Sequence, residues 1–214
     1  MVLVIAMMVA RRFSTAVFVH LCGAGSESFE PISTLISRSI ERLRAFVSER
    51  GRAVVEPLDR MAGRSVFVTS ADDPNLDVLL ETMTERRQVS IVAPRYISDI
   101  TVTGDKRILL IDGEPVPTAL ARMPPPHDHR GNISAEATTE CRALTPGERH
   151  ICERLGPVLR ERGLIFVGID VTGDLLTGIN VTSATGIREL ERDAGHSVAA
   201  MLFDRFEPHL GRSG

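Results

Sequence analysis

The stretch Gly104-Asp-Lys-Arg-Ile-Leu-Leu-Ile-Asp-Gly-Glu-Pro-Val-Pro117 decides how the centre of this chain folds. Its apolar run Ile108–Ile111 predicts a short buried strand, and the charged residues before the run lead into it. Asp112–Gly113 is a strong signal for a tight turn between antiparallel strands. The second strand is expected over Val116–Ala121, so the sequence predicts a β-hairpin here.

On either side of the hairpin, the spacing of apolar residues predicts further elements. Helices are expected at Thr34–Arg50, Leu76–Arg86, Pro146–Arg162 and Gly186–Phe206. Strands are expected at Ala53–Glu56, Ser65–Thr69, Ser90–Tyr96, Leu164–Asp170 and Leu175–Val181. Pro94 favours an edge position or a connection for its strand, and Pro124–Ala143 is predicted to be a long irregular loop. Because these elements form no clean βαβ repeat, the sequence predicts the α+β class.

The composition is that of an ordinary globular chain. Of its 214 residues, 43% are apolar and 25% are charged. The net charge of -3 gives no electrostatic reason to expect a nucleic acid or an anionic membrane as partner. Cys22, Cys141 and Cys152 are widely spaced and form neither a disulfide framework nor metal-ligand pairs, so a reducing cytoplasm is expected.

The beginning of the sequence is apolar. Met1–Ala10 and Phe13–Leu21 are apolar runs separated by Arg11 and Arg12. Neither run approaches the roughly 20 apolar residues that a membrane span requires. The positive charges follow the first run, whereas in a signal peptide they precede it. Two short buried strands are expected, and the alternative is a cleaved or mis-assigned start.

An ordered set of motifs runs through most of the chain: Glu56-Pro-Leu-Asp59, the stretch 104–117, Arg130-Gly-Asn132, Gly163-Leu-Ile-Phe-Val-Gly-Ile-Asp170, Ile179-Asn-Val-Thr-Ser183 and Ile187-Arg-Glu189. In order and spacing they resemble the bacterial glutathione synthetases of the ATP-grasp ligase family. The resemblance implies the ATP-grasp fold, with ATP held between two α+β lobes, and ATP and Mg²⁺ as cofactors. It also implies a reaction in which γ-glutamylcysteine is activated as an acyl phosphate and the glycine amine then displaces phosphate.

The resemblance divides the chain into three parts. Residues 1–28 have no match in the family, residues 29–103 match the first ATP-grasp lobe with its lid hairpin, and residues 104–214 match the second lobe with the metal and phosphate site. The family's leading domain is expected to be absent, because Met1–Glu27 is too short to replace it.

The resemblance also implies roles for individual residues. Arg107 and Arg130 match arginines that approach the transferred phosphate, a role that suits planar guanidinium groups. The alternative for both is an ordinary surface arginine. The positions matched to ATP binding are Arg60, Gly63, Arg64, Ser65 and, more weakly, Lys106, the only lysine of the sequence. The positions matched to substrate binding are Asn132, Thr182, Ser183 and Thr185.

Asp170 and Asn180 match magnesium ligands at the ends of two strands. Mg²⁺ prefers oxygen ligands such as carboxylates and amides, although Asp and Asn at strand ends also commonly cap turns. His127 and His129 resemble a second metal-binding pair. No third ligand follows them at a recognisable spacing, so a solvated loop is the favoured interpretation.

The sequence departs from the family pattern at positions that handle phosphate. Glu56 and Ile40 stand where the family has phosphate-binding lysines, and Gly178 stands where it has a metal-bridging glutamate. An anion at Glu56 would repel phosphate in a poorly screened site. The glycine-rich lid is replaced by Arg60-Met-Ala-Gly-Arg-Ser65, whose bulkier residues obstruct close backbone approach to phosphate. The apolar framework is better preserved than these positions, so the chain is expected to fold.

Three functional hypotheses follow. The first is a divergent ligase that acts on γ-glutamylcysteine and glycine, with Arg60, Arg64, Lys106 and Arg107 in place of the lysines. The second is a non-catalytic relative that binds a nucleotide, a peptide or a true synthetase subunit. The third is a truncated gene product without a stable role. Impaired activity is expected, and possible partners are a second copy of this chain or a full-length synthetase.

Overall fold

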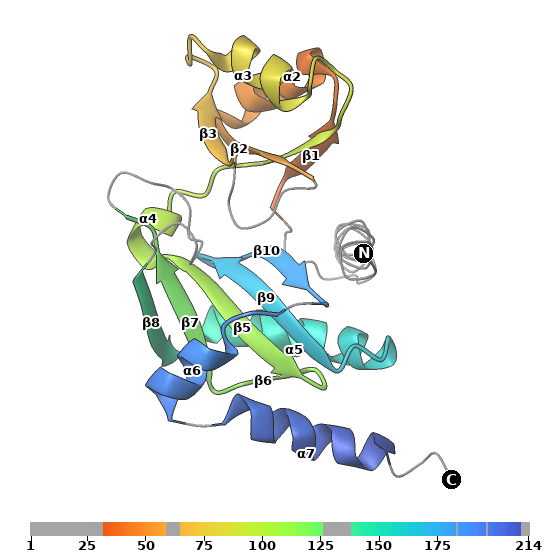
Figure 1. Ribbon diagram of the computed structural model, residues 1–214. Coiled ribbons are helices and arrows are strands. Elements are labelled where there is room, and N and C mark those ends of the chain that lie inside the picture. Colours follow the sequence, from red (N-terminus) through yellow and green to blue (C-terminus); the bar gives the residue numbers. More distant parts are fainter. Residues whose placement is uncertain (1–31, 59–64, 126–137, 183, 196, 211–214) are drawn as a thin grey trace.

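The computed structural model describes residues 32–58, 65–125, 138–182, 184–195 and 197–210. Within these ranges the chain forms a four-stranded and a six-stranded sheet, each covered by helices (Figure 1). The α+β class expected from the sequence is confirmed. The strands expected within residues 1–21 and the pair His127 and His129 lie outside the described residues. No described helix combines the length and the apolar character needed to cross a bilayer.

The smaller sheet contains β1 (Thr34–Ser37), β2 (Arg52–Pro57), β3 (Phe67–Ser70) and β4 (Ile91–Pro94), in the antiparallel order β1-β4-β2-β3. Helices α2 (Ile40–Arg50) and α3 (Leu76–Met83) cover one face of it (Figure 1). Alternation along β2 buries Ala53 and Val55 in the core under these helices. Glu56 therefore lies on the opposite, helix-free face.

The helix expected over Thr34–Arg50 is a strand followed by a helix. Thr34–Ser37 pairs with β4, and α2 begins only at Ile40. Ser39 caps α2 with its hydroxyl, which accepts a hydrogen bond from Arg42 N at 3.3 Å. Two adjacent apolar residues fit a strand and a helix equally well, so spacing alone could not separate the two elements.

β4 lies inside its sheet, between β1 and β2, although Pro94 favours an edge. Pro94 is the last residue of β4, so its missing N–H removes little from the ladder. The helix expected over Leu76–Arg86 ends earlier, at Met83. Glu85 and Arg86 adopt positive φ values of 48° and 54°, which are incompatible with a continuing helix.

The larger sheet contains β5 (Asp105–Ile111), β6 (Glu114–Pro115), β7 (Thr118–Met123), β8 (Thr138–Ala143), β9 (Phe166–Thr172) and β10 (Leu175–Asn180). The order is β10-β9-β5-β7-β8, and β6 pairs with β5 across the predicted turn at Asp112–Gly113, so the hairpin is confirmed. The irregular loop expected over Pro124–Ala143 is wrong at its end, where Thr138–Ala143 pairs with β7. Its polar residues gave no strand signal because β8 is an edge strand.

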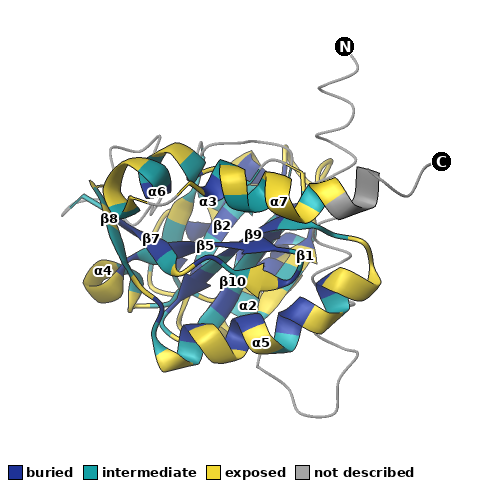
Figure 2. Ribbon diagram, turned by 90° about the horizontal axis from the view of Figure 1, so that it is seen from below, coloured by how far each residue is buried: buried dark blue, intermediate teal, exposed yellow. Residues whose placement is uncertain are grey.

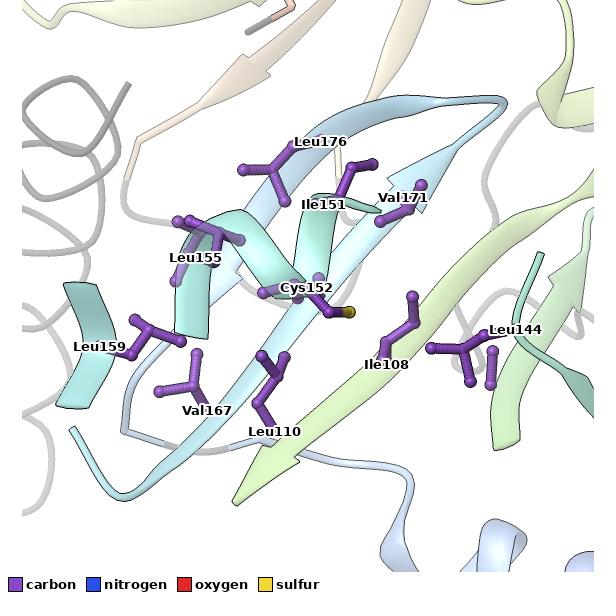
Figure 3. Packing of buried hydrophobic residues seen from close by; sticks show 13 residues of the cluster. Ile108, Leu110, Leu144, Ile151, Cys152, Leu155, Leu159, Val167, Val171 and Leu176 are labelled. Carbon is purple, nitrogen blue, oxygen red and sulfur yellow. The ribbon is translucent and has the colours of Figure 1, made fainter. Parts of the chain in front are cut away.

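Helices cover both faces of the larger sheet (Figures 1 and 2). α5 (Pro146–Glu161) lies on one face, and α6 (Ile187–Ala194) and α7 (Val198–Leu210) lie on the other. Alternation along β5 sends Ile108 and Leu110 into the core under α5 (Figure 3). The residues that alternate with them face the core under α6 and α7. Consecutive residues of β5 therefore point in opposite directions, and this rule also applies to its charged residues.

The predicted helix at α5 is confirmed, and it packs very close to the hairpin turn. Thr145 and Glu148 form a capping box at its start. A Cβ atom added to Gly156 would lie 2.3 Å from the carbonyl oxygen of Gly113, so only glycine fits there. The single helix expected over Gly186–Phe206 is two helices, because Gly195 adopts a left-handed φ of 72° that ends α6.

Candidate functional site

Four charged side chains meet on the face of the larger sheet that carries α6. Arg107 of β5 lies opposite Asp170 of β9, and Asp105 of β5 lies opposite Arg122 of β7. Asp105 and Arg107 point to the same side because they are two residues apart on one strand. The antiparallel register thus gathers two arginines and two aspartates from three neighbouring strands. We call these four residues the charged cluster.

Asp170 is the centre of the charged cluster. Arg107 binds it with two parallel hydrogen bonds, from Nε to Oδ1 at 2.7 Å and from Nη2 to Oδ2 at 3.0 Å. Arg122 Nη2 donates to Asp170 Oδ1 at 2.5 Å and also to Asp105 Oδ2. Thr172 Oγ1 donates to Asp105 Oδ1 at 3.3 Å. Bidentate contacts between a guanidinium and a carboxylate fix orientation as well as adding energy.

The charged cluster is largely removed from solvent. The side chains of Arg107 and Arg122 are 7% and 8% exposed, and those of Asp170 and Asp105 are 22% and 16% exposed. Burial opposes the ionisation of Asp170, but the charges of Arg122 and Arg107 outweigh it and hold its pKa below the usual value. Burial raises the pKa of Asp105 to about 6, although Arg122 offsets part of this effect.

Small residues leave the space in which the Arg107 side chain lies. A Cβ atom on Gly168 would stand 3.2 Å from Arg107 Cδ and 3.0 Å from the Cβ atom of Ala184. Gly186, with a φ of 108°, passes the same side chain at a longer distance, since a Cβ atom there would stand 3.5 Å from Arg107 Cγ. At its far end, Arg107 Nη1 lies 3.4 Å from the carbonyl oxygen of Thr185, which accepts its hydrogen bond.

The two predicted magnesium ligands lie on neighbouring strands, but their oxygens are already engaged. Both oxygens of Asp170 accept hydrogen bonds from arginines, and Asn180 Oδ1 accepts one from Thr182 N at 3.2 Å. Gly178, which lies opposite Asp170 in the ladder, supplies no side-chain ligand. The described part of the chain holds no group of three His, Cys, Asp or Glu residues suited to a metal ion. The residues present do not fit a magnesium ion held by the protein alone.

Lys106 lies on the opposite face of β5 from Arg107. It points to the same side as Ile108, toward the core under α5, and is 2% exposed. Its Nζ donates to Thr103 Oγ1 at 2.8 Å, within the short helix α4 (Ile100–Thr103). Burial lowers the pKa of this amine, and the positive charge of Arg142 adds to the shift. The structure therefore does not bring Lys106 together with the charged cluster.

Several other predicted site residues lie outside the described part of the chain, namely Arg60, Gly63, Arg64, Arg130, Asn132 and Ser183. Ser65 is described and precedes β3 with a φ of 60°. Thr182 and Thr185 lie in the connection between β10 and α6, where one contacts Asn180 and the other Arg107. The structure thus brings Thr185 to the charged cluster and places Thr182 beside Asn180.

The two positions that resemble lost lysines have different surroundings. Ile40 is the first residue of α2, is 5% exposed and belongs to the core of the smaller sheet. Glu56 lies on the helix-free face of β2, opposite Val92 of β4. In Figure 1 this face is turned toward the larger sheet. The smaller sheet therefore carries Glu56 on the face that is turned toward the larger sheet, while Ile40 contributes no charge.

The sequence reasoning missed Asp105 and Arg122. The strand expected over Val116–Ala121 stops one residue before Arg122, and Asp105 was assigned to the approach to a strand. A signal was available, because Asp105 and Arg107 have the two-residue spacing of a strand face next to an apolar run. Extending both strands through these residues would have placed all four charges on one face.

The fold places this chain in the ATP-grasp class. The crystal structure of D-cycloserine synthetase DcsG matches it with a TM-score of 0.72 and 15% identity, over 94% of this chain and 71% of that one. The ATP-grasp ligase PsnB, complexed with minimal precursor, matches with a TM-score of 0.66 and 18% identity, over 93% of this chain and 60% of that one. Identities this low establish the fold alone.

Sequence comparison narrows the class to one family. The model of the prokaryotic glutathione synthetase ATP-grasp domain matches residues 26–195, and the chain belongs to this family. The glutathione synthetase of Xanthomonas axonopodis pv. citri (strain 306) is 50% identical over 174 residues, which are 81% of this chain and 55% of that protein. The chain spans about half the length of the curated relatives it matches. The family uses ATP and magnesium.

Proposed function

We propose that this chain is the phosphate-binding part of a glutathione synthetase-type ligase whose own activity is weak. The reaction joins γ-glutamylcysteine to glycine at the expense of ATP. The observation that carries the proposal is the convergence of Arg107 and Arg122 on Asp170 in a family member. Two buried guanidinium groups on neighbouring strands suit the recognition of phosphate oxygens.

The reaction depends more on neutralising the charge of the transferred phosphoryl group than on acid or base groups. A carboxylate oxygen of γ-glutamylcysteine attacks the γ-phosphorus of ATP, and ADP leaves. The glycine amine then attacks the acyl carbon, loses a proton, and inorganic phosphate leaves. Arg107 and Arg122 would orient the transferred phosphoryl group and neutralise the charge on its oxygens. Their rigid placement on β5 and β7 keeps the two donors in fixed positions.

The same site explains why the rate should be low. In the structure Asp170 accepts hydrogen bonds from both arginines, so a phosphate must displace this carboxylate to reach them. Glu56 adds a negative charge on the face turned toward the larger sheet (Figure 1). Ile40 is buried and contributes no cation. Each of these features weakens the attraction for ATP phosphates.

The second candidate function is that of a non-catalytic binding protein. It is favoured by the hydrogen bonds that Asp170 already accepts from two arginines. Such a protein would bind a nucleotide, or a synthetase subunit, without turnover. The two candidates share the ATP-grasp fold and differ in whether phosphate is released. An assay for phosphate release therefore distinguishes the two candidates.

The deciding experiment mixes the purified chain with ATP, magnesium, γ-glutamylcysteine and glycine, and measures phosphate and glutathione together. We expect slow formation of both in equal amounts, and Arg107→Lys should lower the rate about a hundredfold because the bidentate contact is lost. Arg188→Lys, at an exposed position on α6, is the matched control and should leave the rate unchanged. ATP binding without turnover would support the non-catalytic candidate, and the absence of both would overturn the two together.

A further inference from the structure

We propose that the charged cluster binds phosphate groups directly as an anion, with no divalent cation held on Asp170, and that Asp170 competes with this ligand for the two arginines. This inference rests on the proposed phosphate-binding role. It goes further, because it states that the Asp170 carboxylate binds the two arginines whenever the phosphate ligand does not. It also makes Gly178 the residue that sets the metal requirement of the site.

The first argument is the charge balance of the site. The charged cluster contains two guanidinium groups and two carboxyl groups, so its ionised form is neutral. A divalent cation on Asp170 would stand beside two guanidinium groups that lie 2.5 to 3.0 Å from the same carboxylate. Repulsion between like charges is strong where solvent is excluded. An anion is attracted by the same two guanidinium groups, and it competes for them with the Asp170 carboxylate.

The second argument concerns the residue opposite Asp170 in the ladder. Gly178 pairs with Asp170, and a Cβ atom added to Gly178 would stand 3.1 Å from Asp170 Oδ2. An acidic side chain at 178 would therefore carry a second carboxylate to the same spot. Glycine leaves Asp170 between two arginines with no second carboxylate opposite it in the ladder, so a side chain that could share a Mg²⁺ with Asp170 is missing there.

The third argument is an unused donor. The Arg122 side chain is 8% exposed, and its buried Nε makes no hydrogen bond to any described residue. A buried donor without a partner costs free energy, and an oxygen of a bound ligand would remove that cost. Arg122 thus retains hydrogen-bonding capacity after its contacts with Asp105 and Asp170. A polyphosphate, with many acceptor oxygens, is the chemical class that fits.

The test is a calorimetric titration of inorganic tripolyphosphate into the folded chain, once with EDTA and once with excess magnesium. We expect saturable binding that persists in EDTA. Asp170→Asn keeps the shape of the side chain and removes its charge, so it should tighten binding in EDTA about tenfold by releasing the arginines. A site that holds its metal on Asp170 would show the opposite change, with weaker binding in this variant.

Gly178→Glu provides an independent test at the neighbouring position. The added carboxylate should weaken tripolyphosphate binding in EDTA about tenfold and make binding depend on magnesium. Gly178→Ala adds the same Cβ atom without the charge, so its binding of tripolyphosphate should stay independent of magnesium. Thermal melting of each variant identifies those that remain folded.

The proposal is overturned if EDTA abolishes binding to the parent chain, if folded Asp170→Asn binds more weakly, or if the folded parent binds no tripolyphosphate under either condition. These titrations contain no γ-glutamylcysteine and no glycine. A chain that lacks ligase activity can therefore still pass them, and the two proposals fail separately.

Discussion

Asp170 is held by Arg107 and Arg122 at the same time, from strands on the same side of it. Its Oδ1 accepts hydrogen bonds from Arg107 Nε at 2.7 Å and from Arg122 Nη2 at 2.5 Å. One carboxylate thus links β9 to β5 and β7, which lie side by side in the sheet. The link is electrostatic, so its contribution can be measured by removing a single charged group.

Asp170→Ala should lower the free energy of unfolding by about 3 kcal/mol, because it leaves two largely buried arginines without this partner. Urea unfolding followed by circular dichroism measures the change. Asp77→Ala is the matched control, since Asp77 pairs with Arg44 at the exposed surface. That substitution should cost at most about 1 kcal/mol. Equal losses in the two variants would show that the charged cluster is solvated in solution.

Asp105 should make the chain less stable as the pH rises from about 4 to about 6. Burial raises its pKa from the ordinary value of 3.8 to about 6 in the folded chain. Between these values the folded state holds more protons than the unfolded state, so raising the pH favours unfolding. Asp105→Asn removes this group. Urea midpoints measured at about pH 4.5 and about pH 7 should therefore fall less in the variant than in the parent.

Asp170 has the opposite effect on how stability depends on pH. The same unfolding measurements therefore distinguish it from Asp105. Its pKa lies below the usual value, so it stabilises the fold above the unfolded pKa, and this contribution is lost as the pH falls through the folded pKa. An Asp105→Asn variant whose midpoints follow those of the parent over the whole range would contradict the raised pKa of Asp105.

The Cys152 thiol should not react with alkylating reagents in the folded chain. It is fully buried in the core under α5, and burial raises the pKa of its thiol to about 12 (Figure 3). In a Cys22→Ser background, iodoacetamide labelling followed by peptide mass spectrometry should modify Cys152 only as the protein unfolds. Cys141 is half-buried and serves as the internal comparison. Equal labelling rates for the two thiols in native buffer would contradict the packing of α5.

Gly156→Ala should destabilise the chain by about 2 kcal/mol or more, because the new methyl group would meet the backbone of the hairpin turn at Gly113. Backbone atoms cannot rotate away as a side chain can, so α5 would have to move. Thermal unfolding measures the loss. Glu153→Ala, on the exposed side of the same helix, is the control, and a similar small shift in both variants would show that α5 has room at the turn.

Much of the fold could be predicted because apolar runs and turn signals are local. Ile108–Ile111 with Asp112–Gly113 gave the central hairpin, and the spacing in Pro146–Arg162 gave α5. The errors fall where tertiary pairing decides the conformation. Thr138–Ala143 is a strand because β7 is beside it, and its own sequence is mostly polar.

The site was predicted only in part, for a related reason. Arg107 and Asp170 came from the resemblance to a family, and the structure brings them into contact. Arg122 and Asp105 were missed because a charged residue at the end of a strand looks exposed in the sequence. Their burial depends on pairing across β5, β7 and β9, and no local pattern contains that information.

Lys106 is the only lysine of the sequence, and its side chain is 2% exposed. Reagents and enzymes that modify side-chain amines, such as succinimidyl esters, acetyltransferases and ubiquitin ligases, therefore have no accessible lysine on the folded chain. Modification of Lys106 would therefore report an opening of the fold that exposes this buried amine.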